Sequence, residues 1–135
     1  MAQGQTRPAP TGSYAASDQV YMIRVTPSPE TINDPKAYEF FAGRDAKGQA
    51  IWTHDFFEIK PLLDWEGHMG VVTATYVAPL KRYLLPVTDC RGPKNDANGP
   101  YATCLLESKN LTGPWKLVTY LRTFGEQGYF VNFPT

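Results

Sequence analysis

Apolar and polar residues alternate along several short stretches of the chain, a pattern that predicts β-strands with one face toward a core. The clearest stretches follow Gly67 and are separated by turn-forming residues. They cover residues 69–77 (MGVVTATYV), 82–88 (RYLLPVT), 101–108 (YATCLLES) and 115–121 (WKLVTYL). Because each stretch leads through a turn or loop into the next, we expect four successive strands in an antiparallel meander.

The first half of the chain predicts a less regular arrangement. Strands are expected at 19–26 (QVYMIRVT) and 49–53 (QAIWT), where β-branched and aromatic residues are frequent. Residues 54–67 are largely apolar, but Pro61 interrupts any helix there. We therefore interpret 54–67 as a packed connection between two sheet units.

A short helix is expected between these two strands. Asp34 is suited to cap it, and Pro35 is suited to its first position. Residues 36–42 would supply two turns with one apolar face, and Gly43 is a natural C-terminal stop.

Four strands in a repeat of roughly 40–60 residues are typical of one blade of a β-propeller. A further strand is expected to begin near Gln127. The predicted organisation is a disordered lead-in over 1–18, the outer strands and connection of a partial blade over 19–67, a complete four-stranded blade over 68–122, and the first strand of a further blade over 123–135. The predicted fold class is therefore all-β, a β-propeller fragment with one short helix.

Composition narrows the classes of function without identifying one. The chain has 135 residues, in which 13 Lys and Arg balance 13 Asp and Glu, so it lacks the basic surplus that usually accompanies binding to nucleic-acid phosphates. No apolar run approaches the roughly 18 residues needed to span a membrane. These features argue against a nucleic-acid partner and a membrane span, and the sequence contains no phosphate loop or cofactor motif.

The two cysteines, Cys90 and Cys104, flank a loop rich in Gly, Pro and Asn. If the flanking segments pair as antiparallel strands, a disulfide across this loop would stabilise the fold by roughly 3 kcal/mol. Two unrelated buried thiols are the alternative. Together with His54 and His68, the cysteines lack the spacing of a zinc site, so no metal is expected. Asn110 begins an Asn-Leu-Thr triplet, an N-glycosylation pattern that matters only in a eukaryotic secretory route.

Three groups of residues carry a resemblance to a known family. They are 37–43 (AYEFFAG) with 48–52 (GQAIW), 76–85 (YVAPLKRYLL) with 111–115 (LTGPW), and 124–125 (FG), Gln127 and 129–134 (YFVNFP). In this order they are similar to uncharacterised five-bladed β-propeller proteins related to family 43 glycoside hydrolases. The resemblance covers residues 19–135 and implies a carbohydrate-directed, extracellular propeller, of which about one and a half blades are present.

Glycoside cleavage generally needs two carboxyl groups on opposite sides of the scissile bond, one to protonate the leaving oxygen and one to attack or to activate water. Glu66 and Glu126 each precede a predicted innermost strand, at loop ends where sites tend to lie. They are the candidate catalytic pair, and the alternative is two surface carboxylates beside glycines. Most other acids, Asp89 among them, adjoin turn residues and are expected to be solvated.

Four further residues are candidates for holding a sugar. His68 is suited to proton transfer or to donating to a hydroxyl, while Gln127 and Asn132 offer paired donor and acceptor atoms for vicinal hydroxyls. Tyr129 adds a flat apolar face with a polar tip. The structural alternatives are a loop histidine without a role and an asparagine that satisfies backbone groups of the sheet. The three tryptophans are expected to be packing residues: Trp52, Trp65 and Trp115.

The leading hypothesis is a fragment of a secreted, carbohydrate-active β-propeller that acts on or binds glycans and needs no cofactor. Its partners would be an oligosaccharide and the missing blades of the parent propeller. The fragment alone is expected to be inactive. Two alternatives remain open: a propeller that binds glycans without catalysis, and a small β domain that oligomerises through open sheet edges.

Overall fold

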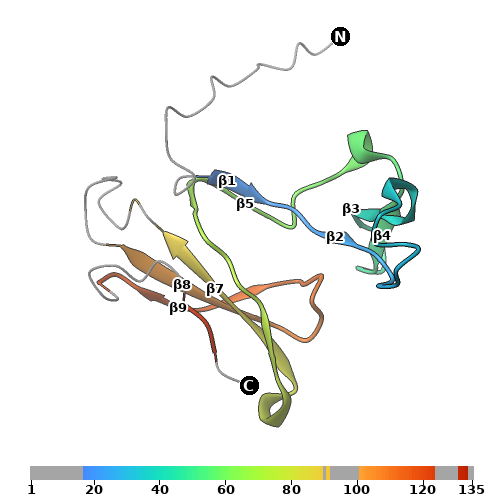
Figure 1. Ribbon diagram of the computed structural model, residues 1–135. Helices are drawn as coiled ribbons and strands as arrows, with labels where there is room; N and C mark the ends of the chain where they lie inside the picture. Colours follow the sequence, from blue (N-terminus) through green and yellow to red (C-terminus); the bar gives the residue numbers. More distant parts are fainter. Residues whose placement is uncertain (1–16, 90, 92–100, 124–130, 134–135) are drawn as a thin grey trace, which may run out of the picture.

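The computed structural model describes residues 17–89, 91, 101–123 and 131–133, and it confirms the all-β prediction. Its strands form three antiparallel sheets: a two-stranded ribbon, a three-stranded sheet and a four-stranded sheet (Figure 1). The strands are β1 (Ser17–Val20) and β5 (Leu63–Met69) in the ribbon, β2 (Ile23–Arg24), β3 (Glu39–Arg44) and β4 (Ala50–Thr53) in the three-stranded sheet, and β6 (Thr75–Val77), β7 (Arg82–Asp89), β8 (Ala102–Ser108) and β9 (Lys116–Leu121) in the four-stranded sheet. The described helices are single 3-10 turns: η1 (Pro35–Ala37), η2 (Phe56–Glu58) and η3 (Ala78–Leu80).

The four-stranded sheet confirms the predicted meander. Its strands lie in the order β6-β7-β8-β9, so each strand pairs with its neighbour in sequence, and every pairing is antiparallel. The register places Val87 opposite Cys104 and Cys104 opposite Tyr120. Because opposed residues in antiparallel strands project from the same side, these three side chains share one face of the sheet.

The segment predicted as one strand at 69–77 is divided between two sheets. The ribbon strand β5 ends at its first residue, and β6 occupies only its last three residues. Between them, Val72 forms a bridge to Val87, and the backbone N–H of Thr88 donates to the Val71 carbonyl at 2.8 Å. The chain thus leaves the ribbon and joins the edge of β7 without an intervening helix or long loop.

Two segments of the first half also differ from the prediction. The strand predicted over 19–26 is interrupted after Val20, because β1 and β2 pair in different sheets. Residues 54–67, predicted as a connection, contain η2 and most of β5, so that interpretation is wrong for 63–67. The cause is a distant partner, since β5 pairs with β1 and places Leu63 opposite Val20.

The predicted helix is wrong beyond its first turn. Asp34 caps it as expected, because its Oδ1 accepts from the Lys36 N–H at 2.9 Å and η1 follows. The chain then becomes extended and forms β3, in which Phe40 pairs with Ile23 on one side and with Thr53 on the other. A two-turn helix has little stability of its own in water, whereas the extended segment gains two strand partners.

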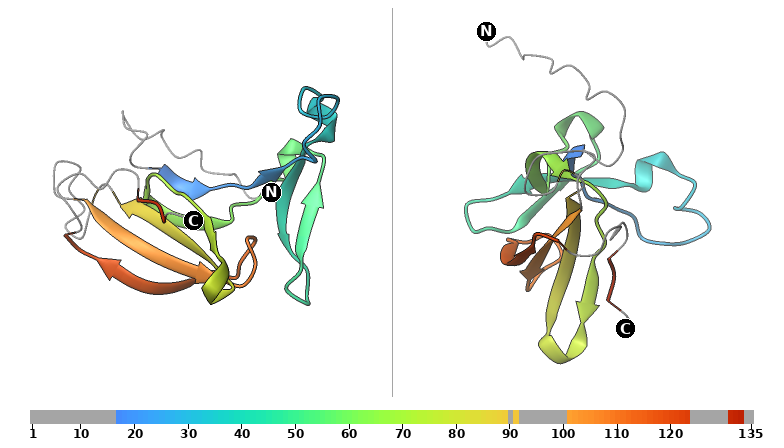
Figure 2. Two further views of the ribbon diagram at one scale, coloured as in Figure 1. Left: turned by 60° about the horizontal axis from the view of Figure 1, so that its bottom comes forward. Right: turned by 90° about the vertical axis from the view of Figure 1, so that its left-hand side faces the viewer.

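The main core lies between the ribbon and the four-stranded sheet, over which the ribbon runs (Figure 2). Four buried residues form its centre, and six partly buried apolar side chains pack around them. The centre is Met69, Leu85, Val87 and Cys104, and the surrounding residues are Val20, Leu63, Val72, Leu106, Trp115 and Tyr120. A smaller core lies on the three-stranded sheet, where Phe41 is 1% exposed and its ring meets Trp52 edge-on at 6.0 Å.

The start of the described chain is part of the ribbon. Most of the lead-in predicted over 1–18 lies outside the described residues, but its last two residues, Ser17 and Asp18, belong to β1. Asp18 Oδ1 accepts from the Gly67 N–H at 2.7 Å. Gly67 has φ of 73°, a left-handed conformation that favours glycine, and a Cβ there would meet the Arg91 side chain at 3.0 Å. A glycine is therefore strongly favoured at this position of β5.

Residues 131–133 lie beside the segment that leads into β6. Thr73 Oγ1 donates to the Val131 carbonyl at 2.7 Å, and Thr75 Oγ1 donates to Asn132 Oδ1 at 2.9 Å. These three residues are not in a strand. The remainder of the predicted further strand, which opens near residue 127, lies outside the described residues.

Candidate functional site

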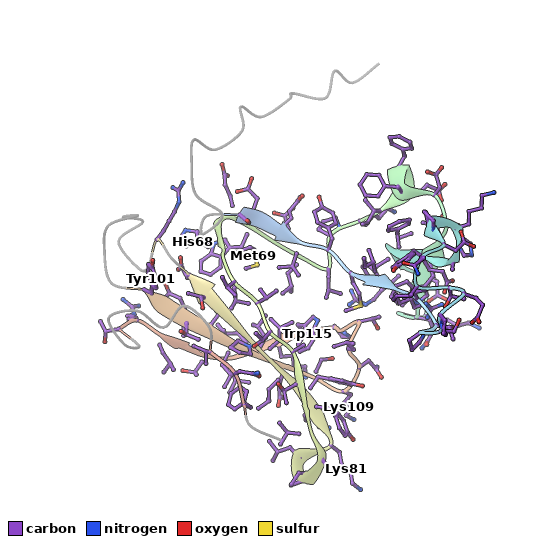
Figure 3. All side chains as sticks on the ribbon, viewed as in Figure 1. His68, Met69, Lys81, Tyr101, Lys109 and Trp115 are labelled. Carbon is purple, nitrogen blue, oxygen red and sulfur yellow. The ribbon has the colours of Figure 1, made fainter. Side chains whose placement is uncertain are left out.

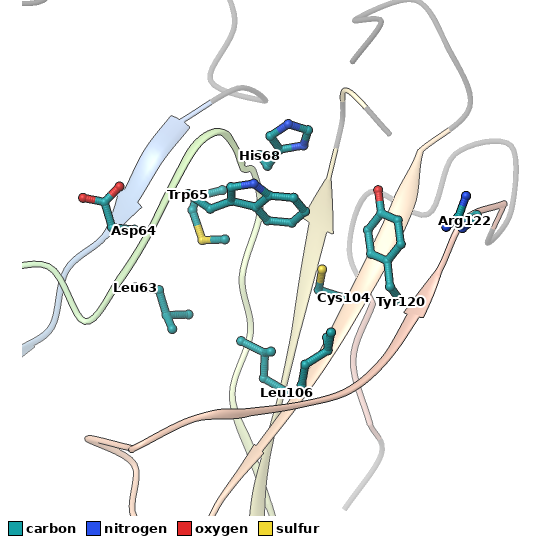
Figure 4. Close-up of a pocket in the computed structure, with 10 residues that line it drawn as sticks. Leu63, Asp64, Trp65, His68, Cys104, Leu106, Tyr120 and Arg122 are labelled. Carbon is teal, nitrogen blue, oxygen red and sulfur yellow. The ribbon is translucent and has the colours of Figure 1, made fainter. Parts of the chain in front are cut away.

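A cavity of about 700 Å³ lies between β5 and the ribbon-facing side of β8 and β9 (Figure 4). We call it the Trp65 cavity. Apolar side chains form most of its wall, and Asp64, His68 and Arg122 add polar groups. The complete lining is Leu63, Asp64, Trp65, His68, Met69, Cys104, Leu106, Leu117, Tyr120 and Arg122. Its volume falls within the range of roughly 300–1,000 Å³ typical of small-ligand sites, which are also mostly apolar with a few placed polar groups.

Trp65 is held in place by two other rings. Its indole stacks on the His68 imidazole with ring centroids 4.2 Å apart and planes 13° apart. The Tyr120 ring approaches it edge-on at 6.2 Å. Trp65 nevertheless remains 39% exposed, so a large rigid aromatic surface borders the cavity and is accessible to a ligand.

A buried carboxylate orients the polar end of the cavity. Asp89, the last residue of β7, is fully buried. Its Oδ1 lies 2.8 Å from His68 Nδ1 and accepts from the Arg91 N–H at 3.1 Å, while its Oδ2 accepts from the Tyr120 hydroxyl at 2.7 Å. Both carboxylate oxygens are therefore engaged, as burial of a carboxylate requires. This network fixes the rings of His68 and Tyr120, which in turn hold Trp65.

The same burial keeps the neighbouring groups neutral. Burial, and then the hydrogen bond to Asp89, raise the pKa of Tyr120 well above its ordinary value. Burial, together with the negative charge of Asp89, raises the pKa of the Cys104 thiol to about 11. At neutral pH Tyr120 is thus a hydrogen-bond donor, and Cys104 is not an activated nucleophile.

Cys104 is expected to react slowly with thiol reagents while the protein is folded. With a pKa of about 11, its thiolate fraction at pH 8 is roughly one in a thousand, against about a quarter for an ordinary cysteine. Labelling of a Cys90→Ser variant with Ellman's reagent at pH 8 should therefore be at least about a hundredfold slower in buffer than in denaturant.

The shift at Cys104 also determines the direction of a pH effect on stability. The unfolded thiol loses its proton near pH 8.5, whereas the folded thiol keeps it to about pH 11. The folded state then binds more protons in this interval, so the free energy of unfolding should fall as pH rises through it, and Cys104→Ala should reduce that fall. Fast labelling of the folded protein, or a fall unchanged by Cys104→Ala, would contradict the assignment.

Of the predicted site residues that the structure describes, one lies in the cavity wall. His68 lies in its wall, whereas Glu66, on the same strand, is exposed and is not part of the lining. Asn132 is not part of the lining, and its Oδ1 accepts hydrogen bonds from Thr75 Oγ1 and the Phe133 N–H, so its role toward a sugar stays a prediction. The other candidates lie outside the described residues, and their roles stay predictions: Glu126, Gln127 and Tyr129.

The two predicted modifications have different outcomes. Cys104 is a free, buried thiol that lies opposite Val87, so it does not carry the predicted disulfide, and Cys90 lies outside the described residues. Asn110 is exposed in the turn between β8 and β9, and its N–H donates to Ser108 Oγ at 3.1 Å. Glycosylation of Asn110 stays a prediction.

Three residues that build the site were not predicted to do so: Asp89, Trp65 and Tyr120. Asp89 was expected to be solvated, which is wrong, because β7 extends through it and Tyr120 of β9 reaches its carboxylate. Trp65 was expected to be a packing residue, but it borders the cavity. The only signal in the sequence is that Asp89 directly follows the strand pattern, with no turn residue between. The two rings that contact Asp89, those of His68 and Tyr120, are far away in the sequence, so no local pattern indicates these contacts.

The described residues contain no group of three or more His, Cys, Asp or Glu suited to hold a metal ion. Among the helices in the described ranges, none has the length and apolar character needed to cross a membrane. No known protein family, curated protein or solved structure matches the chain.

Proposed function

We propose that the protein recognises a carbohydrate, and that a sugar ring lies against Trp65 in the Trp65 cavity. The observation that carries this proposal is the combination, in one cavity, of a fixed aromatic ring with polar side chains. A sugar ring has an apolar face of C–H groups and a rim of hydroxyls, so its binding site needs both kinds of surface. The resemblance to carbohydrate-directed propellers and the four-stranded meander support the same conclusion, and a secreted propeller is the proposed context.

The aromatic part of the site is organised before a ligand arrives. His68 stacks on one side of Trp65, and Tyr120 meets its edge. Both rings are themselves fixed by hydrogen bonds to Asp89. A ligand that lies on the indole therefore does not have to order it, which favours affinity.

The polar part offers several groups to hydroxyls. Because His68 Nδ1 faces Asp89, its second ring nitrogen remains for another partner. Asp64 accepts from Gln19 Nε2 through Oδ2 at 2.7 Å, which leaves its other oxygen as an acceptor. The exposed Arg122 guanidinium adds donors at the cavity.

Glycoside cleavage is the catalytic part of the proposal, and the resemblance implies it. Glu66 and Glu126 are the assigned pair of carboxyl groups, and they would act in the parent propeller. The cavity itself is assigned to binding, since the buried Asp89 carboxylate behind His68 and Tyr120 is occupied by three hydrogen bonds.

Replacing Trp65 by alanine should weaken carbohydrate binding at least about tenfold, which corresponds to about 1.4 kcal/mol. The reason is that the variant removes the aromatic ring on which the sugar is proposed to lie. Isothermal titration against a panel of neutral and acidic oligosaccharides measures the affinity. Phe57→Ala is the matched control, because Phe57 is 93% exposed and is not part of the cavity.

Three results would contradict parts of the proposal. Equal affinity of the Trp65→Ala variant and the unchanged protein would place the sugar elsewhere. Binding of an apolar aromatic compound, with no response to any oligosaccharide, would replace the carbohydrate by another ligand class. Glycoside turnover that survives in both Glu66→Gln and Glu126→Gln would remove the catalytic assignment.

A further inference from the structure

A second hollow, of about 300 Å³, lies at the end of the four-stranded sheet where β7 begins, β8 ends and β9 begins. Its lining includes three cationic residues, Arg82, Lys109 and Lys116. Figure 3 shows Lys109 toward this end of the sheet, with His68 toward the other end. The hollow is thus separate from the Trp65 cavity and shares no lining residue with it.

The strand register places two of the three cations, Arg82 and Lys116, on one face of the sheet. Leu84 lies opposite Glu107, and Glu107 lies opposite Lys116. Arg82 precedes Leu84 by two positions in β7, and residues two apart in a strand project from the same face. Lys109 lies in the bend directly after β8 and lines the same hollow. Long side chains from two strands and from the bend after β8 therefore line one small area.

Within the part of the chain that the structure describes, positive charge exceeds negative charge in this area. Among the described residues, Arg82, Lys109 and Lys116 form no ion pair, and Glu107 forms none either. Arg82 uses Nη1 to donate to the Lys81 carbonyl at 3.2 Å, which leaves most of its N–H groups for another partner. Three cations face one carboxylate here, although the whole chain has a formal charge of zero.

We propose that this hollow binds an anionic oxygen group, a sulfate or phosphate, which is either free or esterified to a larger ligand. The guanidinium of Arg82 can engage two oxygens at once, and the two ammonium groups supply further charge. The Asn110 side chain, which also lines the hollow, adds an amide. The proposal does not rest on the carbohydrate function proposed above.

Backbone NMR spectra during titration with sodium sulfate, at constant ionic strength maintained with chloride, test the proposal. We expect saturable shifts confined to amides around residues 82, 107–110 and 116. The double variant Lys109→Gln/Lys116→Gln should weaken binding at least about tenfold. Glu107→Gln should strengthen it about threefold, because the only carboxylate of the hollow is removed. Lys36→Gln/Lys47→Gln is the control, since both lysines are exposed and lie outside the hollow.

Several results would overturn the proposal. They are linear, unsaturated shifts, equal weakening by the control variant, and no weakening by the double variant while its spectrum retains the folded pattern. Titration with a sulfated disaccharide and its neutral counterpart identifies the source: tighter binding than inorganic sulfate indicates an ester, and equal binding indicates the free ion. The Trp65→Ala variant should bind sulfate unchanged, so failure here and failure of the carbohydrate proposal can be distinguished.

Discussion

Replacing Asp89 by alanine is expected to lower the free energy of unfolding by about 3 kcal/mol, as when one partner of a buried, hydrogen-bonded charge is removed. The Asp89 carboxylate is fully buried and engages His68 at 2.8 Å and the Tyr120 hydroxyl at 2.7 Å. Alanine would leave both of these polar groups without their partner and would leave a gap beside the His68 and Tyr120 rings. Urea unfolding, followed by tryptophan fluorescence, measures the change.

Two further variants isolate the contribution of the Asp89 network. Asp89→Asn keeps the shape of the side chain and one acceptor oxygen, so about half of the loss is expected. Asp34→Ala also removes a carboxylate that accepts a backbone hydrogen bond, but Asp34 is exposed, and the loss should stay below about 1 kcal/mol. Equal losses in the Asp89 and Asp34 alanine variants would mean that the network contributes no more than an exposed cap.

Phe41→Ala is expected to destabilise the fold by about 3–4 kcal/mol, the range for truncating a buried phenylalanine. Phe41 is 1% exposed, and its ring meets Trp52 at 6.0 Å and lies 5.5 Å from the guanidinium carbon of Arg44. Because the smaller core has few other buried side chains, the surrounding strands have little with which to fill the gap. Thermal unfolding followed by circular dichroism measures the loss.

The chain offers a matched control for this substitution. Phe57→Ala removes the same atoms at a position that is 93% exposed, so its effect on stability should lie within about 0.5 kcal/mol of zero. A similar loss in both variants would contradict the placement of Phe41 in a core. An unchanged stability of Phe41→Ala would show that the three-stranded sheet does not depend on this ring.

Local pattern was sufficient to predict the meander, because each of its strands pairs with a neighbour in sequence and turn residues mark the joints. It was insufficient for the ribbon, since β1 and β5 are separated by the whole three-stranded sheet. The prediction of a two-turn helix after Asp34 was wrong for a related reason. Its apolar residues fit a helical period, but the strands on either side of β3 decide its conformation.

The site shows the same division between local and distant information. The position of His68, directly after Gly67 and before an expected strand, made it a candidate, and it does line the cavity. Its orientation depends on Asp89, which belongs to another sheet, and on stacking with Trp65. Both contacts depend on the packing of the ribbon against the four-stranded sheet. Local sequence patterns do not reveal that packing, so these contacts could not be predicted from the sequence.

One wall of the Trp65 cavity is held by pairing between remote parts of the chain, with Val20 opposite Leu63. A ligand that binds at Trp65 favours those molecules in which β1 and β5 are already paired. Ligand binding and the pairing of β1 with β5 are then thermodynamically coupled. A bound ligand would therefore stabilise the ribbon and hold the first half of the chain in place. On warming, the ligand would dissociate as β1 and β5 separate, while the locally paired strands of the meander would persist to higher temperature.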